Sequence, residues 1–492
     1  MIMTLASRLL GLVRLRIMSS LLGATASGDI FFFTFNLANN SRKLLAEGAL
    51  SSAYIPTYSS LVARNTSEAG GFFLRTLYVL SVVTLIAGGL LYFTAEPLLG
   101  TISQLDQELI AQYGAVLLGI FTIYLLGIIL TTLLAGTMQV HGRFFLPSLA
   151  PLIVSASVIS VSMMWYPRFG ILAIAWGFAV GAVIPVLMML LRVLQFYSGG
   201  IEKPQKRIST HLMGNWGILL LLSSALFVSQ QVSFYLASTL AEGSVMIFSN
   251  ALMIWQLPFG VFFVSIASSL YPELSQLYAQ RDADGARDRL SRAAGYVLAL
   301  LIPSAALLWL FAHEVSQLIL LSGRYDEASV AATASLLRYL SPALPAAGIT
   351  QLFMRDLYIR SAWSSAVVRT LLLTAIDIIC SILLIRTALG LSGLPAAYTL
   401  STMVLAWISL IRFRPDRHSL LHWVQIVCSG LLAFGVMWIL RRFITPWQGS
   451  WLSLTAYICV ISAAGTVPLL LMYQRLGVYI FTGRRSQPSR SA

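Results

Sequence analysis

Charged residues are scarce in this sequence. Asp, Glu, Lys and Arg make up 10% of its 492 residues, whereas soluble globular proteins contain about 25%. Apolar residues make up 58%, and no segment is long and polar enough to form a soluble domain. This composition argues against a soluble enzyme or binding domain. It predicts an all-α polytopic membrane protein, because each membrane span needs roughly 20 mostly apolar residues.

Cysteine is also rare in this sequence, and we find neither a signal-peptide pattern nor a nucleotide-binding motif. The three cysteines all lie inside apolar runs, which favours buried thiols over disulfides or metal ligands. Arg8, Arg14 and Arg16 occur where a cleavable signal peptide would have its apolar segment, so we expect no such peptide. The sequence has no G-x-x-x-x-G-K-[ST] motif, so an ion gradient or the membrane potential is the expected energy source.

The apolar runs predict about fourteen spans arranged in two halves. The predicted spans are 3–24, 28–62, 72–95, 108–137, 144–166, 170–197, 210–240, 244–273, 291–312, 327–355, 362–386, 389–412, 418–441 and 452–480. We expect an N-terminal lobe of six spans at 1–197, a polar cytoplasmic linker at 198–209 and a C-terminal lobe of six spans at 210–412. Residues 413–492 would contain the last two spans and a basic tail.

The distribution of Lys and Arg orients these spans. If both termini lie on one face, the loops of that face contain 20 of the 32 basic residues, the other loops contain 5, and 7 lie within or at the ends of spans. Basic residues concentrate in cytoplasmic loops, so we expect both termini in the cytoplasm. This topology accounts for the net charge of +14, and no nucleic-acid partner is expected.

An internal repeat supports the division into halves. The stretches "YIPTYSSLVAR" and "LYPELSQLYAQR" share the pattern Pro-x-x-Ser-x-Leu-x-Ala when aligned on Pro56 and Pro272, which lie 216 residues apart. This offset corresponds to six spans, and an even number of spans relates the repeats by an axis along the membrane normal. Transporters with this plan bind their substrate near the middle of the membrane, between the halves.

The first two predicted spans carry charges that lipid would not tolerate. An arginine at the bilayer centre costs roughly 2.5–3.5 kcal/mol, so we expect Arg8, Arg14 and Arg42 to face a hydrated cavity. Lys43 and Glu47 are four residues apart and could pair on one helix face. Because arginine offers a planar, bidentate group that suits phosphate, these residues predict a binding site for an anion.

Two stretches resemble a known family. "ASRLLGLVR" and "GDIFFFTFNLANNSRKLLAEGALSSAYIP" are similar to the N-terminal signature of the MurJ/MviN lipid II flippases, in the multidrug/oligosaccharidyl-lipid/polysaccharide exporter superfamily. The resemblance implies two six-helix lobes around a central cavity, two further C-terminal helices, and a location in the bacterial inner membrane. It also implies that the protein flips lipid II, an undecaprenyl-pyrophosphate-linked disaccharide-peptide, to the outer leaflet by alternating access. This step would serve peptidoglycan synthesis and cell shape. We expect a monomer.

The resemblance also implies roles for individual residues. The functional arginines of the family fall on Arg8, Arg14 and Arg42, which would engage the pyrophosphate. Its functional aspartate falls on Asp29, and the acidic residue of its "AEGA" motif falls on Glu47. The complete set of predicted substrate-binding residues is Arg8, Arg14, Arg42, Asp29, Glu47, Lys43 and Asn39.

The eighth predicted span departs from the family pattern. The family usually has Asp and Arg where "ALMIWQLP" (251–258) has Leu252 and Met253. This loss leaves open a related exporter of another lipid-linked oligosaccharide or amphipathic solute. A non-transporting paralogue is a third possibility, although a scaffold would gain nothing from the insertion cost of its arginines.

Asp377 is the clearest carboxylate deep in a predicted C-terminal span. Ser381 lies one helical turn further on, Thr399 lies in the next span, and a resemblance to family members with a sodium site adds Ser233. One interpretation is a site for a monovalent cation, Na⁺, with a coupling or structural role. The other is an aspartate that is protonated or hydrogen bonded to a polar neighbour. No other cofactor is expected.

Overall fold

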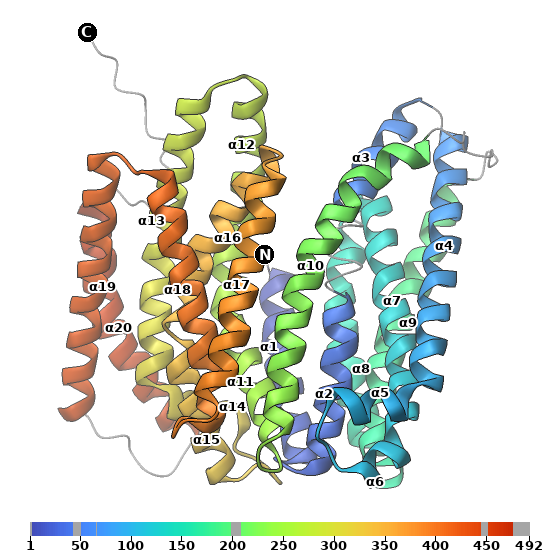
Figure 1. The fold of residues 1–492 in the computed structure, drawn as a ribbon, viewed down its shortest axis with the longest axis horizontal. Coiled ribbons are helices and arrows are strands. Elements are labelled where there is room, and N and C mark those ends of the chain that lie inside the picture. Colours follow the sequence, from blue (N-terminus) through green and yellow to red (C-terminus); the bar gives the residue numbers. More distant parts are fainter. Residues whose placement is uncertain (1, 43–50, 65, 198–207, 444–450, 476–492) are drawn as a thin grey trace. The chain divides into compact units, whose positions relative to one another are not determined.

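The structure is a computed structural model of residues 1–492, and it describes residues 2–42, 51–64, 66–197, 208–443 and 451–475. Within these ranges the secondary structure is helical, apart from an isolated bridge between Ser322 and Tyr325 (Figure 1). The predicted all-α fold class is therefore confirmed for the described residues.

The helices follow one another along the chain with short connections. The first group is α1 (Ile2–Leu22), α2 (Ala26–Arg42), α3 (Ser51–Arg64), α4 (Thr66–Phe93), α5 (Ala95–Ile102), α6 (Gln107–Leu109), α7 (Ala115–Val140), α8 (Phe145–Phe169) and α9 (Ile171–Leu194). The next group is α10 (Ile208–Ser238), α11 (Ser244–Pro258), α12 (Val264–Ala279), α13 (Ala283–Leu310), α14 (Ala312–Leu320), α15 (Glu327–Leu340) and α16 (Ala343–Ile359). The last group is α17 (Trp363–Leu384), α18 (Gly393–Phe413), α19 (Arg417–Phe443) and α20 (Trp451–Arg475).

Nine helices within the described ranges are long and apolar enough to cross a membrane. They are Ser67–Phe93, Gln107–Val140, Phe145–Phe169, Ile171–Tyr197, Ser244–Ala279, Ala283–Leu310, Trp363–Leu384, Gly390–Phe413 and Arg417–Phe443. The chain is thus an all-helical, multi-pass membrane protein. The count of fourteen spans stays a prediction.

One predicted span is divided in the structure, and the continuity of another stays a prediction. The span predicted at 28–62 overlaps α2 and α3, and residues 43–50 lie outside the described residues. The single helix predicted at 327–355 is wrong, because α15 ends at Leu340 and α16 begins at Ala343. The break falls at Pro342, which disfavours helical backbone at the preceding residue and has no amide hydrogen to donate.

The helix boundaries follow the repeat offset of 216. Adding 216 to the first residue of α4, Thr66, gives position 282, and α13 begins at Ala283. The same shift takes the first residue of α8, Phe145, to position 361, and α17 begins at Trp363. The helical pattern of the first half of the chain therefore recurs in the second half.

The chain forms two compact units. The first consists of Met1–Asn250, Ile319–Ala332 and Thr370–Leu394, and the second of Ala251–Leu318, Thr333–Arg369 and Pro395–Ala492. Helices α1 and α2, which carry the predicted substrate-binding residues, both belong to the first unit. The lobe boundaries predicted from the sequence stay a prediction.

Small residues bring α8 and α9 close together in the first unit. Gly177 and Gly181 lie one turn apart on α9 and face Val158 and Val154 of α8. A Cβ atom at Gly177 would lie 2.8 Å from the Cα atom of Val158, and one at Gly181 would lie 2.8 Å from the Cα atom of Val154. Glycines spaced in this way let membrane helices approach backbone to backbone.

We predict that Gly177→Ala destabilises the protein by about 1–3 kcal/mol, because the added methyl group meets backbone that cannot rotate away. Gly89→Ala in α4 is the matched control, since nothing lies within 4 Å of a Cβ atom there. Thermal unfolding in detergent would measure both variants. Equal melting temperatures for the two would contradict the close packing of α8 on α9.

Candidate substrate-binding site

Helix α1 carries three arginines in three different environments. Arg8 is half-buried near the start of the helix. Arg14 is half-buried, and its guanidinium lies over the ring of Phe178 in α9, with Cζ 5.1 Å from the ring centroid. Arg16 donates a hydrogen bond of 3.0 Å from Nη2 to the carbonyl oxygen of Leu321. Arg16 is therefore held by the backbone of a segment far away in the sequence.

The partner of Arg14 is an aromatic cluster. Phe178 is 1% exposed, and its ring centroid lies 4.7 Å from that of Phe35 in α2 and 5.4 Å from that of Tyr124 in α7. Within the described ranges no carboxylate lies within ion-pair distance of Arg14. A cation–π contact positions the guanidinium without cancelling its charge. Arg14 therefore stays able to attract an anion.

Helix α2 is buried along most of its length and satisfies its polar side chains by hydrogen bonds. Asn36 donates from Nδ2 to the carbonyl oxygen of Phe32 at 2.7 Å and to Oγ of Ser249 at 2.9 Å. Asn40 donates to Oε1 of Gln231 at 3.3 Å. These bonds tie α2 to α11 and α10 and explain how asparagines are tolerated among phenylalanines.

Arg42 is the last residue of α2 and is half-buried. Its Nε donates to Oδ1 of Asn39 at 3.1 Å, so the two predicted residues are brought together on one helix face. Lys43 and Glu47 lie outside the described residues, and their predicted pairing is untested.

Asp29 has a structural role that the sequence did not indicate. The side chain is 4% exposed, and its two oxygens accept hydrogen bonds from the backbone amides of Gly243 at 2.7 Å and Met246 at 2.8 Å. These amides lie at the start of α11, so Asp29 satisfies donors that have no partner inside the helix.

The start of α2 is capped in return. Oε1 of Glu242 accepts a hydrogen bond of 2.7 Å from the backbone amide of Ala26, and these two residues are 216 positions apart. The repeat offset thus relates the two capped helices, α2 and α11. Asp29 of α2 caps the start of α11, and Glu242, which lies just before α11, caps the start of α2. Glu242 was not among the predicted residues, although its position one repeat after Ala26 could have indicated it.

Leu252 and Met253 are half-buried residues of α11. They bring no charge to α11 at the two positions where the resemblance implied Asp and Arg. The arginines among the predicted substrate-binding residues therefore all lie on α1 and α2.

Asp377 lies in α17 and is 6% exposed. Its Oδ2 accepts a hydrogen bond from Oγ of Ser229 in α10, a contact that sequence analysis missed. Ser229 lies one turn before the predicted Ser233, whose hydroxyl donates to the Ser229 carbonyl oxygen at 3.2 Å, so helical spacing could have indicated it. Ser381 is buried, and its Oγ has no hydrogen-bond partner among the described residues. These oxygens are of the type that binds Na⁺.

Thr399, the remaining residue predicted for the cation site, belongs to the second unit. Its Oγ1 donates to the carbonyl oxygen of Tyr339 at 2.6 Å. Among the described residues there is no group of three or more His, Cys, Asp and Glu side chains that could hold a metal ion. The described side-chain neighbours predicted or found around Asp377 are serine hydroxyls of α10 and α17.

The fold is that of a multi-pass membrane protein of a known architecture. The structure matches the solved "Lipid II flippase MurJ, inward closed conformation" with a TM-score of 0.79 and 20% identity, over 96% of this chain and 98% of that one. It also matches an inward-facing multidrug resistance transporter of the MATE family with a TM-score of 0.69 and 17% identity, over 83% and 94% of the two chains.

The sequence gives the more specific relationship. The model of the family described as "Lipid II flippase MurJ" matches residues 18–471 of this chain. A "Probable lipid II flippase MurJ" of Borreliella burgdorferi is 27% identical over 482 residues, covering 96% of this chain and 94% of the relative. The chain belongs to the MurJ lipid II flippase family, which is a family of transporters and not of enzymes.

We predict that Asp29→Ala lowers the stability of the protein by about 2–4 kcal/mol, because each buried amide left without a partner costs roughly 1–3 kcal/mol. Asp29→Asn keeps one acceptor oxygen and should lose less. Thermal unfolding of both purified variants provides the measurement. Wild-type stability of Asp29→Ala, combined with loss of transport, would assign Asp29 to substrate binding rather than to capping.

Proposed function

We propose that this protein flips lipid II from the inner to the outer leaflet of the bacterial cytoplasmic membrane for cell-wall synthesis. Membership of the MurJ family over nearly the whole chain supports this substrate. The observation that carries the proposal is Arg14, held over Phe178 with its positive charge uncompensated by any described carboxylate. Such a guanidinium suits a pyrophosphate, whose charge and oxygens match arginine donors.

In this proposal Arg8, Arg14 and Arg42 engage the pyrophosphate. Asn39 orients Arg42 through their hydrogen bond. Lys43 and Glu47 would extend the polar surface. Asp29 would act indirectly, by fixing the start of α11 against α2.

The topology in this proposal is that of the family. Fourteen helices form an N-terminal lobe at 1–197 and a C-terminal lobe at 210–412 around a central cavity, with residues 413–492 supplying the last two helices. Both termini lie in the cytoplasm, as the excess of basic residues in the loops of that face supports. Alternating exposure of the cavity to the two sides would carry the head group across while the lipid tail stays in the bilayer.

A second candidate is the export of another lipid-linked oligosaccharide. Leu252 and Met253 favour it, because a family member without the eighth-span charges could recognise a different head group. Both candidates share the pyrophosphate and differ in the sugar and peptide. Competition between head groups for binding to the purified protein distinguishes them.

We predict that Arg14→Ala abolishes rescue of a bacterium depleted of its own lipid II flippase, while the wild-type gene rescues growth. The loss of charge-assisted hydrogen bonds should weaken binding of lipid II to the purified protein by about 10- to 100-fold. Arg64→Ala is the matched control, since Arg64 is an exposed residue at the end of α3. Rescue by Arg14→Ala at equal expression would reject the proposed role. Failure of the well-expressed wild type would favour the second candidate.

We also propose a monovalent cation site at Asp377, with Ser229, Ser233 and Ser381 as neighbouring oxygen donors and Thr399 as a predicted member. The buried Oγ of Ser381, without a described partner, supports this site. When bound there, Na⁺ would supply either a coupling charge or a link between helices.

We predict that Asp377→Asn removes any sodium dependence of lipid II transport in proteoliposomes, because it removes the only formal charge of the proposed ligand set. Ser381→Ala should raise the sodium concentration needed for half-maximal transport. Transport by Asp377→Asn with unchanged sodium dependence would discard the site and favour a plain Asp–Ser hydrogen bond.

A further inference from the structure

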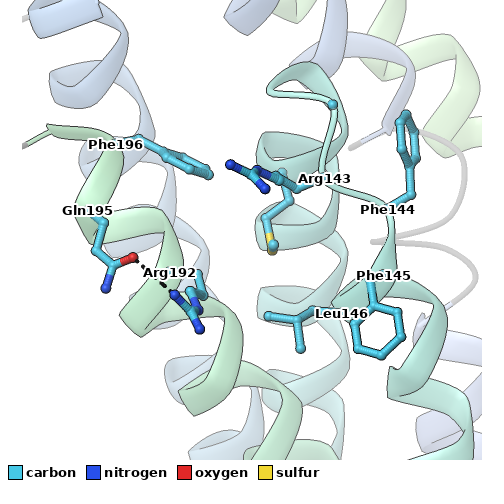
Figure 2. A pocket seen from close by; sticks show the side chains of 9 residues that line it. Arg143, Phe144, Phe145, Leu146, Arg192, Gln195 and Phe196 are labelled. Carbon is cyan, nitrogen blue, oxygen red and sulfur yellow. Dashed lines mark hydrogen bonds between the residues drawn. The ribbon is translucent and has the colours of Figure 1, made fainter.

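A basic cavity lies at one end of the first unit, and none of its lining residues comes from α1 or α2. It has a volume of about 580 Å³ and lies between the α7–α8 connection and the end of α9. Arg143 comes from the connection, and Arg192 and Gln195 come from the end of α9 and the short turn that follows. Figure 2 shows the side chain of Arg143 pointing toward Phe196 across the gap and that of Arg192 beside Gln195.

The charge of this cavity is not neutralised by the described residues. None of the described residues that line it is acidic, and within the described ranges neither Arg143 nor Arg192 forms an ion pair. Arg192 makes a long contact of 3.5 Å with Oε1 of Gln195, which leaves most of its donors available. Two arginines without a carboxylate attract an anion.

One wall of the cavity is held in place by a hydrogen-bonded aromatic group. The ring of Phe196 stacks on His141 with centroids 4.3 Å apart, and Nε2 of His141 lies 3.0 Å from the hydroxyl of Tyr58, which also contacts the hydroxyl of Tyr197. Burial lowers the pKa of His141, so its imidazole is neutral at neutral pH. The positive charge of the cavity therefore comes from its arginines.

The position of the cavity points to a lipid. Three membrane-crossing helices meet here: Gln107–Val140 and Ile171–Tyr197 end at it, and Phe145–Phe169 begins at it. The cavity thus lies at one boundary between membrane and water, where lipid head groups are found. Phe144 and Phe145 are each 63% exposed and offer apolar surface beside the arginines.

We infer that this cavity binds the phosphate of an anionic glycerophospholipid, with Arg143 and Arg192 on the phosphate and the phenylalanines along the upper acyl chain. Basic pockets between membrane helices recognise anionic head groups in this way. The excess of basic residues places this face in the cytoplasm, where the inner leaflet would supply the lipid. The inference is independent of which lipid the protein transports.

The test is native mass spectrometry of the delipidated full-length protein, titrated separately with phosphatidylglycerol, phosphatidylcholine, undecaprenyl pyrophosphate and inorganic phosphate. The wild type should retain phosphatidylglycerol in preference to phosphatidylcholine. R143Q/R192Q should bind phosphatidylglycerol roughly 30-fold more weakly, since each basic residue near an anionic surface contributes about a fivefold factor. R143K/R192K should keep most of the preference, because it keeps both charges.

The matched control is R64Q/R168Q, which removes two exposed arginines of the same unit that do not line the cavity. Wild-type binding by this control supports the site, and a loss equal to that of R143Q/R192Q would overturn it as a bulk charge effect. No preference for phosphatidylglycerol in the wild type would also overturn it. Displacement of phosphatidylglycerol by undecaprenyl pyrophosphate would assign the cavity to the transported lipid instead. Equal occupancy by inorganic phosphate would show an anion site without lipid specificity.

Discussion

A polar or charged group among apolar helices must find a partner, and this requirement shapes the first unit of the protein. Asp29 is buried because it accepts from two amides at the start of α11, and Glu242 accepts from the first amide of α2. The asparagines of α2 bond to α10 and α11 for the same reason. These contacts fix α2, and α2 in turn places Phe35 against Phe178, the ring that holds Arg14. The geometry of the proposed site thus depends on polar contacts that do not themselves touch a substrate.

Some arginines contact a carboxylate and Arg14 contacts an aromatic ring, and this difference distinguishes arginines with a structural role from the arginine proposed to bind substrate. In the second unit Arg441 bonds to Glu314 at 2.6 Å, and Arg360 bonds to Asp356, so these charges are compensated within the protein. Arg14 instead lies over an aromatic ring, which positions the guanidinium and leaves its charge in place. An arginine without a carboxylate partner is costly to insert, and the anion binding proposed for Arg14 accounts for that cost. This distinction supports a pyrophosphate ligand better than it supports a scaffold.

Sequence reasoning reached the fold class and the family but not the contacts that hold the site. Composition and periodicity were sufficient for a multi-pass helical protein, and the motif around Asp29 was sufficient for the family. The capping role of Asp29 could not be read locally, because its partners lie more than 200 residues away. The same is true of Phe178 beneath Arg14. Pro342 could have predicted the break between α15 and α16, but the apolar run continues across it. The one-turn spacing between Ser229 and Ser233 could likewise have predicted Ser229 as a neighbour of Asp377.

The central claim is that the arginines of α1 and α2 serve a lipid-linked pyrophosphate. The most direct measurement is transport of lipid II by the purified protein in proteoliposomes, with excess undecaprenyl pyrophosphate or undecaprenyl monophosphate as competitor. We expect transport that the pyrophosphate lipid inhibits much more strongly than the monophosphate lipid. Transport that neither lipid inhibits, or that both inhibit equally, would contradict recognition of the pyrophosphate by these arginines.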